Sequence, residues 1–99
     1  GTVWGWLIGP FINAHLATFK DAKRASQILE PFKDQLSNEC FGSINEVFEG
    51  GGAQSAKGCV AQAWSVGEVL RAWTLLNPGP PAKSKSQSKP KKIKVPSRL

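Results

Sequence analysis

The sequence has few of the residues from which metal and redox sites are built. It contains one histidine, His15, and two cysteines, Cys40 and Cys59, which lie 19 positions apart without a CxxC pair. Zinc sites need clustered cysteine and histidine ligands, so the sequence predicts no metal site, and no motif predicts a cofactor. Isolated cysteines are typical of free thiols in a reducing compartment, and we therefore expect free thiols and a cytoplasmic location.

The sequence also lacks a long apolar run and the motifs of several common enzyme classes. Its most apolar stretch, residues 3–19, is interrupted by Pro10, Asn13 and His15, and is shorter than the roughly 20 apolar residues that a bilayer span needs. No basic segment precedes it, so we expect neither a membrane helix nor a secretory signal. No GxSxG, Walker, GxGxxG or HExxH motif supports a serine hydrolase, a nucleotide-binding protein or a zinc protease.

Acidic residues are missing from the C-terminal segment. Residues 83–99 carry seven Lys or Arg and no acid, whereas residues 1–82 carry six basic and seven acidic side chains. The formal charge of +6 therefore belongs to the tail. Its composition is that of an arm for nucleic acid or an anionic surface, but no aromatic residue is interleaved for base stacking. We favour a disordered, solvated Lys/Ser/Pro-rich tail over residues 78–99 and do not expect nucleic acid as the partner.

Helical spacing of apolar residues dominates residues 1–77, which we interpret as one domain of the all-α class. The pattern predicts helices from Trp4 or Pro10 to Phe19, from Asp21 to Leu36 and from Val60 to Leu76. Pro31 must kink or split the second helix, because its ring clashes with the carbonyl group four residues earlier. The glycine-rich residues 37–58 are predicted to form a long loop, with room for one short strand or turn.

A carboxylate in that loop is a candidate acid or base. Glu46 lies between Gly42 and Gly50, with Ile44 before it and Val47 after it. Taken alone, the pattern favours an ordinary loop carboxylate or a helix cap, because glycoside hydrolysis requires two carboxylates. The nearest alternatives are Glu49 and Glu68, and the latter has the spacing of a helix-face charge paired with Arg71.

Tryptophan is the other notable residue type. Trp4 and Trp6 flank Gly5, and Trp64 follows Gln62 by two positions on the third predicted helix. Indoles most often pack in a core, but their flat faces also suit the apolar face of a pyranose ring. Four tryptophans are a heavy aromatic load for so small a domain, so we expect part of this surface to meet a partner, such as the remainder of a larger helical domain.

Four blocks of sequence together resemble the C-terminal end of the glycogen debranching enzymes, the amylo-alpha-1,6-glucosidase family. They are GTVWGWLIGPFINA at residues 1–14, LEPF at 29–32, GSINEVFEG at 42–50 and KGCVAQAWSVGEVLRA at 57–72. The blocks stand in the family's order and cover residues 1 to about 76. We regard the resemblance as specific.

The resemblance implies a fold, a reaction and a site. The fold is an (α/α)6 toroid, of which this chain would supply a few helices. The reaction is the inverting hydrolysis of α-1,6-glucosidic branch points by two carboxylates. Glu46 corresponds to the general base, while Trp4, Trp6, Gln62 and Trp64 would line the glucose pocket. The segment that carries the family's general acid lies upstream of these blocks.

We therefore expect a partial amylo-alpha-1,6-glucosidase. Its partners would be branched α-glucan and the remainder of the catalytic domain, and we expect no hydrolysis by the isolated chain. The first residue, Gly1, is not an initiator methionine, which suggests processing or a cut from something longer. Two alternatives stay open. One is a non-catalytic glucan-binding module that uses Trp4, Trp6 and Trp64, and the other is an interaction protein whose basic tail binds nucleic acid or an anionic surface.

Overall fold

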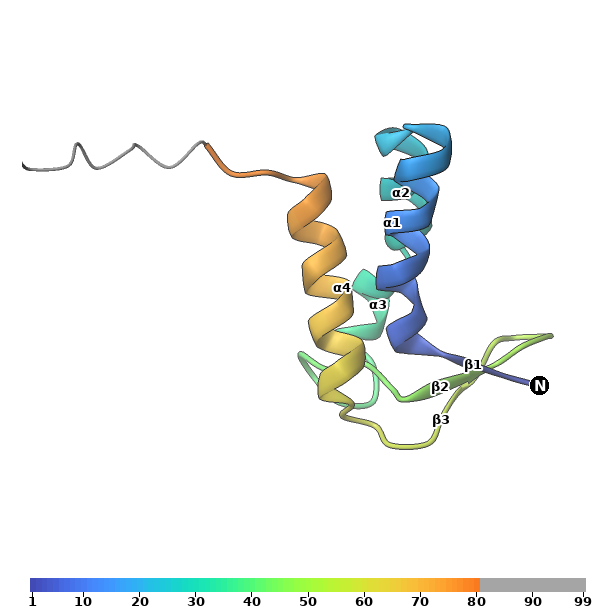
Figure 1. Cartoon of the computed structure of the whole chain (residues 1–99). Coiled ribbons are helices and arrows are strands. Elements are labelled where there is room, and N and C mark those ends of the chain that lie inside the picture. Colours follow the sequence, from blue (N-terminus) through green and yellow to red (C-terminus); the bar gives the residue numbers. More distant parts are fainter. Residues whose placement is uncertain (81–99) are drawn as a thin grey trace, which may run out of the picture.

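A computed structural model describes residues 1–80, in which a small sheet lies at one end of a group of helices (Figure 1). Most of the regular structure is helical, in agreement with the pattern of apolar residues. The strands are β1 (Thr2–Trp4), β2 (Val47–Glu49) and β3 (Ala56–Lys57), and the helices are η1 (Gly5–Leu7, a 3-10 turn), α1 (Ile8–Phe19), α2 (Ala22–Leu29), α3 (Phe32–Gln35) and α4 (Ala63–Leu76).

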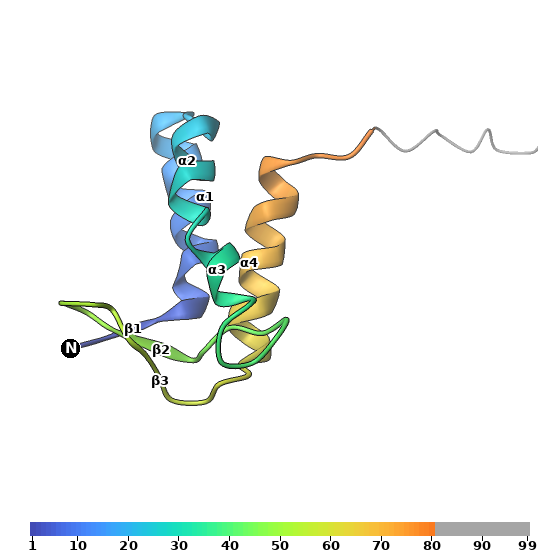
Figure 2. The same cartoon turned by 180° about the vertical axis from the view of Figure 1, so that it is seen from behind.

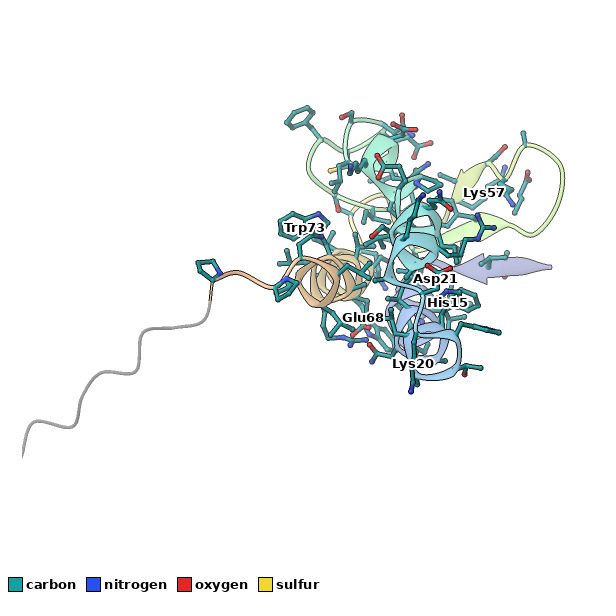
Figure 3. The ribbon with its side chains drawn as sticks, turned by 90° about the horizontal axis from the view of Figure 1, so that it is seen from above. His15, Lys20, Asp21, Lys57, Glu68 and Trp73 are labelled. Carbon is teal, nitrogen blue, oxygen red and sulfur yellow. The ribbon has the colours of Figure 1, made fainter. Side chains whose placement is uncertain are left out.

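The first two α-helices are separated by a two-residue turn. Pro10 lies in the first turn of α1, where its missing N–H removes no helical hydrogen bond. Helix α1 ends at Phe19, and the next residue, Lys20, caps it in a left-handed conformation (φ 55°) and donates its N–H to the carbonyl of Leu16 at 3.0 Å. Asp21 then caps α2 by accepting a 2.9 Å hydrogen bond from the Arg24 amide. Figure 3 labels Lys20 and Asp21 at this turn.

Pro31 splits the second predicted helix into α2 and α3, as its ring geometry requires. The Glu30 N–H still donates to Ser26 at 3.0 Å, but Pro31 has no N–H with which to continue the ladder. The Lys33 N–H instead donates to Glu30 at 3.0 Å, and the chain resumes as the short α3.

The sheet corrects the expectation of an all-α fold. Strands β1, β2 and β3 pair antiparallel in that order, with Thr2 opposite Glu49, Trp4 opposite Val47 and Phe48 opposite Ala56. The predicted loop thus contains two strands, and the N-terminal residues that could have begun a helix add a third. Strands of two or three residues are too short to display the alternation by which a strand is recognised in a sequence.

Helix α4 begins at Ala63, three residues later than predicted. The residues just before it are held in extended backbone by the loop, since the Cys59 carbonyl accepts from the Glu46 amide at 2.9 Å and the Gln62 amide donates to Ile44 at 3.0 Å. Gln62 itself has extended dihedral angles (φ −94°, ψ 106°). Apolar spacing from Val60 onward cannot reveal these hydrogen bonds.

The core lies where α1, α2 and α4 meet. Its buried side chains come from all three helices, and α4 stands beside the pair formed by α1 and α2 in both views (Figures 1 and 2). The buried members are Ile12, Ala25, Leu29 and Ala72, with Ile8, Leu16, Ile28, Phe32, Val69 and Leu76 packed against them. The predicted helices therefore share one core, but Phe11, Leu70 and Trp73, which also follow the apolar spacing, remain exposed.

Two sequence predictions concern the ends and the surroundings of this body. The tail predicted over residues 78–99 lies outside the described residues from position 81 onward. Within residues 1–80, no helix combines the length and the apolar composition that a membrane crossing requires.

Candidate functional site

Backbone hydrogen bonds bring three of the distant sequence blocks together below the helices. The Gly5 amide donates to the Glu46 carbonyl at 3.0 Å, and the Gln62 amide donates to Ile44 at 3.0 Å. Gly5 lies between Trp4 and Trp6, so these bonds place the N-terminal indoles, the Glu46 loop and the start of α4 in one region. All five candidate residues predicted from the sequence belong to this region: Trp4, Trp6, Glu46, Gln62 and Trp64.

The Glu46 carboxylate is half-buried and oriented by the backbone that precedes α4. Its Oε2 accepts a 3.2 Å hydrogen bond from the Cys59 amide. Gly58 permits this approach, since a Cβ at that position would lie 2.6 Å from Glu46 Oε2 and Gly58 has a positive φ of 70°. One carboxylate oxygen is therefore fixed. Within residues 1–80 the other oxygen, Oε1, accepts no hydrogen bond, which leaves it able to accept a proton from a water molecule.

The indoles of Trp6 and Trp64 stack on each other. Their ring centroids are 4.2 Å apart and their planes differ by 7°. Each ring thus covers one face of the other, and only the outward faces can contact a ligand. Trp64 remains 53% exposed, while Trp6 is half-buried. Trp4, in β1, is also exposed and lies opposite Val47, the residue after Glu46.

Gln62 stands at the N-cap of α4 without using its side chain as a cap. Its backbone makes the bonds to Ile44 and to the Val66 amide, the latter at 3.2 Å. The half-buried side-chain amide makes no capping hydrogen bond and so keeps its donor and acceptor groups for a ligand.

Two buried polar residues next to the candidates were missed by sequence reasoning. Asn45 is 3% exposed and donates from Nδ2 to Glu39 Oε2 at 3.0 Å, while Ser65 is fully buried beneath Gly5. Asn45 precedes Glu46 and Ser65 follows Trp64, so each is a buried neighbour of a candidate residue in the chain. Their positions in the blocks were visible in the sequence, but their burial was not.

The two alternative carboxylates are engaged in ion pairs. Glu68 Oε2 lies 2.6 Å from Arg71 Nη2, and hydrogen bonding to Arg71 holds the pKa of Glu68 below its usual value. Arg71 Nη1 also donates to Asn13 Oδ1 on α1 at 3.3 Å, so the predicted helix-face pair reaches a second helix. Glu49 Oε1 lies 3.5 Å from Lys57 Nζ. These partners make both carboxylates poorer candidates for proton transfer than Glu46.

Within residues 1–80, the cysteine and acidic side chains are not arranged as the ligands of a metal ion. Cys40 and Cys59 are free thiols. In the part of the chain that the structure describes, no three or more His, Cys, Asp or Glu side chains gather in a group that could hold a metal ion.

Comparison with known families agrees with the four sequence blocks. The model of the amylo-alpha-1,6-glucosidase family matches residues 1–71, which include η1, the Glu46 loop and the first half of α4. Comparison with curated proteins and with solved structures found no match. The family match confirms the resemblance to the C-terminal region of glycogen debranching enzymes, and the chain belongs to the amylo-alpha-1,6-glucosidase family.

Proposed function

We propose that this chain carries the general-base half of an amylo-alpha-1,6-glucosidase site and that its ligand is branched α-glucan. The observation that supports this most strongly is the convergence of the Glu46 carboxylate, the stacked indoles and Gln62 from three distant segments. Glycoside hydrolysis requires two carboxylates, of which Glu46 would supply one, and the exposed indole faces suit the apolar face of a sugar ring.

The proposed chemistry assigns one proton transfer to this chain. In inverting hydrolysis one carboxylic acid protonates the leaving oxygen, while a second carboxylate activates water on the opposite face of the sugar. Glu46 would take the second role, with Oε2 held by the Cys59 amide and Oε1 facing the water. The family's general acid comes from a segment upstream of the matched blocks, so its role is not filled by Glu49 or Glu68, which are ion-paired.

Glucan binding would use the outward faces of the tryptophans. The stacking of Trp6 beneath Trp64 holds the exposed ring in one orientation, which lowers the entropy lost when a sugar stacks on it. Trp4 and the Gln62 amide would contact the ring edges and hydroxyl groups of the same ligand.

The helices would belong to an (α/α)6 toroid. An apolar groove of 410 Å³ between α2, α3 and α4 supports this proposal, because its walls are helix faces that a larger helical domain would cover. Apolar side chains such as Leu29, Val69 and Trp73 line the groove.

Glucan binding is tested by tryptophan fluorescence during titration with a maltooligosaccharide. We expect a saturable change that Trp64→Ala removes and Trp73→Ala preserves. Trp73 is a matched control because it is 50% exposed on the same helix, close to the 53% of Trp64, but has no stacking partner among the described aromatic pairs. A flat response at millimolar sugar, or equal losses in both variants, would refute binding at the indoles.

Catalysis is tested by glucose release from a limit dextrin. We expect none from the 99-residue chain alone. Glucose should appear when a separately produced upstream segment of a family member is added, and Glu46→Gln should lower its rate by at least about 100-fold, the usual size of a general-base contribution. Binding without any release in the mixture would favour the glucan-binding module instead, and release by the chain alone would show that the second carboxylate is already present.

A further inference from the structure

Three exposed cations gather at one end of the group of helices. Lys20 caps the end of α1, and Lys23 and Arg24 lie in the first turn of α2. In both views the turn between α1 and α2 lies at the same end of the helices as the C-terminal end of α4, opposite the sheet (Figures 1 and 2). Figure 3 looks onto this end and labels Lys20. These three residues form the basic end of the molecule.

The cations of the basic end have no carboxylate partner within residues 1–80, because none of them lies within ion-pair distance of an acidic side chain. Asp21, the acid of this turn, is instead engaged as the cap of α2, where it accepts from the Arg24 amide at 2.9 Å. The other Lys and Arg side chains of the same range are each paired with a glutamate: Lys33, Lys57 and Arg71. The positive charge that is available to a partner is therefore concentrated at the basic end.

The sequence continues from this end of the molecule into the basic segment, residues 83–99. Helix α4 ends at Leu76, beside the basic end, and the basic segment follows with seven Lys or Arg and no acid. The basic end and the basic segment are therefore connected by a short stretch of chain. The loop and the sheet at the opposite end of the helices carry carboxylates instead, namely those of Glu39, Glu46 and Glu49.

Exposed apolar side chains accompany these cations. Phe19, next to Lys20, is 68% exposed, and its ring is tilted against His15 with the ring centroids 5.1 Å apart. Leu75, in the last turn of α4, is 49% exposed. Cations beside exposed Phe and Leu side chains are typical of surfaces that bind a bilayer, since the cations meet lipid phosphates and the apolar groups enter the boundary of the acyl chains.

The apolar side chains distinguish between two classes of anionic partner. Lys and Arg alone would also be attracted to the phosphates of nucleic acid. The basic segment contains no aromatic residue on which bases could stack, but it contains the aliphatic side chains of Ile93, Val95 and Leu99. Aliphatic groups and the exposed Phe19 gain most from contact with acyl chains, so the combination favours lipid.

We propose that the basic end and the basic segment together bind the surface of an anionic lipid bilayer. The candidate site lies at the other end of α4, which has 14 residues and is therefore about 21 Å long. Attachment through the basic end thus leaves the indoles and Glu46 at the end of the helices away from the bilayer. It uses none of the candidate-site residues and does not depend on the proposed hydrolase function.

The test is cosedimentation of the 99-residue chain with lipid vesicles. We expect binding to phosphatidylcholine vesicles that contain about 30% phosphatidylserine, little binding to phosphatidylcholine alone, and a loss of binding as salt rises from about 0.1 M to about 0.5 M. Replacing Lys89, Lys91, Lys92 and Lys94 by Gln should weaken binding more than about 100-fold, because each cation near an anionic surface contributes roughly fivefold.

A pair of double variants tests the contribution of the folded part. Lys20→Gln with Lys23→Gln should weaken binding more than about tenfold. Lys33→Gln with Lys57→Gln is the matched control, because it removes the same charge from exposed residues outside the basic end and should change the affinity by less than about threefold. Phe19→Ser, which leaves the charge unchanged, should also weaken vesicle binding. Circular dichroism checks that each variant is folded.

The results that would overturn the proposal are distinct. Equal losses in the two double variants would show attraction by net charge and not by the basic end. A loss in the basic segment variant alone would exclude the folded part from the contact. Tighter binding to a DNA duplex than to the vesicles, at equal phosphate concentration, would exclude lipid as the partner, and no binding to the anionic vesicles would exclude the surface altogether.

Discussion

At the scale of single residues, Gly5 joins the candidate base to the indole pair. It is buried, it separates Trp4 from Trp6, and its amide donates to the Glu46 carbonyl at 3.0 Å. A Cβ at this position would lie 2.9 Å from Ser65 Oγ and 3.1 Å from the Asn45 carbonyl oxygen. The atoms around position 5 are therefore packed too closely to accept any side chain there.

We predict that Gly5→Ala lowers the free energy of unfolding by about 1–3 kcal/mol, the usual cost of inserting a methyl group into a packed interior. Gly67→Ala is the matched control. No described atom would lie within 4 Å of a Cβ there, and Gly67 is exposed in the middle of α4. Alanine should raise stability at that position by roughly 0.5–1 kcal/mol, because it is the better helix former. Urea unfolding followed by circular dichroism measures both, and changes of equal sign would contradict the packing described for Gly5.

The sequence predicts which residues are candidates for the site, but it does not predict which of them contact each other or which are buried. The blocks around Glu46 and Trp64 could be recognised because each is a run of neighbouring residues. The stacking of Trp6 on Trp64 joins positions 58 residues apart, and the burial of Asn45 and Ser65 depends on the whole fold. Tertiary contacts of this kind leave no periodic trace in a single sequence.

At the scale of elements, a polar cluster joins α4 to α1 beside the apolar core. Glu68 pairs with Arg71 on α4, and Arg71 reaches Asn13 on α1 at 3.3 Å. The Glu68 carboxylate lies where a Cβ on Gly9 would stand, so α1 can approach α4 this closely only with glycine at that position. Glu68 and Trp73 lie on different sides of α4 in Figure 3, with Glu68 on the side of α1.

This cluster should make stability depend on pH. Hydrogen bonding to Arg71 holds the pKa of Glu68 below its usual value of about 4.5. A lowered pKa in the folded state means that the ion pair stabilises the fold fully above about pH 4.5 and that this contribution is lost as the pH falls through the lowered value. We predict that Glu68→Gln lowers the melting temperature at pH 7 and that its difference from the parent chain shrinks toward pH 3.

Glu30→Gln is the comparison for that experiment. Glu30 pairs with Lys33 at 2.8 Å, but both side chains are 62% exposed and the pair joins neighbouring positions of the chain. Exposed pairs of this kind contribute little, about 0–1 kcal/mol. If the melting temperatures of Glu68→Gln and of the parent chain differ by the same amount at pH 7 and at pH 3, the charge of Glu68 is not what stabilises the contact.

The longer helices could be predicted from the sequence, whereas the short strands could not. Helices α1, α2 and α4 contain enough turns for apolar spacing to reveal them, and the ring of Pro31 locates the break between α2 and α3. Strand β3 has two residues, and β1 and β2 have three each, so local sequence carries almost no signal for them. Their pairing is set by hydrogen bonds between segments more than 40 residues apart in the case of β1 and β2.

At the scale of the whole molecule, the apolar surface is only partly covered. The 410 Å³ groove between α2, α3 and α4 is open, and Leu70 and Trp73 on its rim are 59% and 50% exposed. This agrees with the expectation that four tryptophans exceed what so small a core can bury. Exposed apolar surface of this kind is usual where a protein meets another domain or partner.

We predict that the dye ANS binds this groove and fluoresces, and that Leu70→Ser combined with Trp73→Ser removes most of that fluorescence. Stability should stay within about 1 kcal/mol of the parent chain, because both side chains are already half exposed. Phe41→Ser is the control, since Phe41 is 89% exposed and does not line the groove. An equal loss of fluorescence in the control would show that the dye reports scattered apolar side chains and not the groove.

The pairing of β1 with β2 also sets the order in which the chain can assemble. Thr2 lies opposite Glu49, so the first strand has no partner until the residues around Glu49, more than 40 positions later in the chain, have been synthesised. Helices α1 and α2 contact each other over a short stretch of chain and can dock before that point. Pairing β1 with β2 closes a longer loop of chain than docking α1 on α2 does. The longer loop loses more conformational entropy, and its closure is therefore slower. We therefore expect the ladder between β1 and β2, and with it the contact between Gly5 and Glu46, to form late, after the helices have docked.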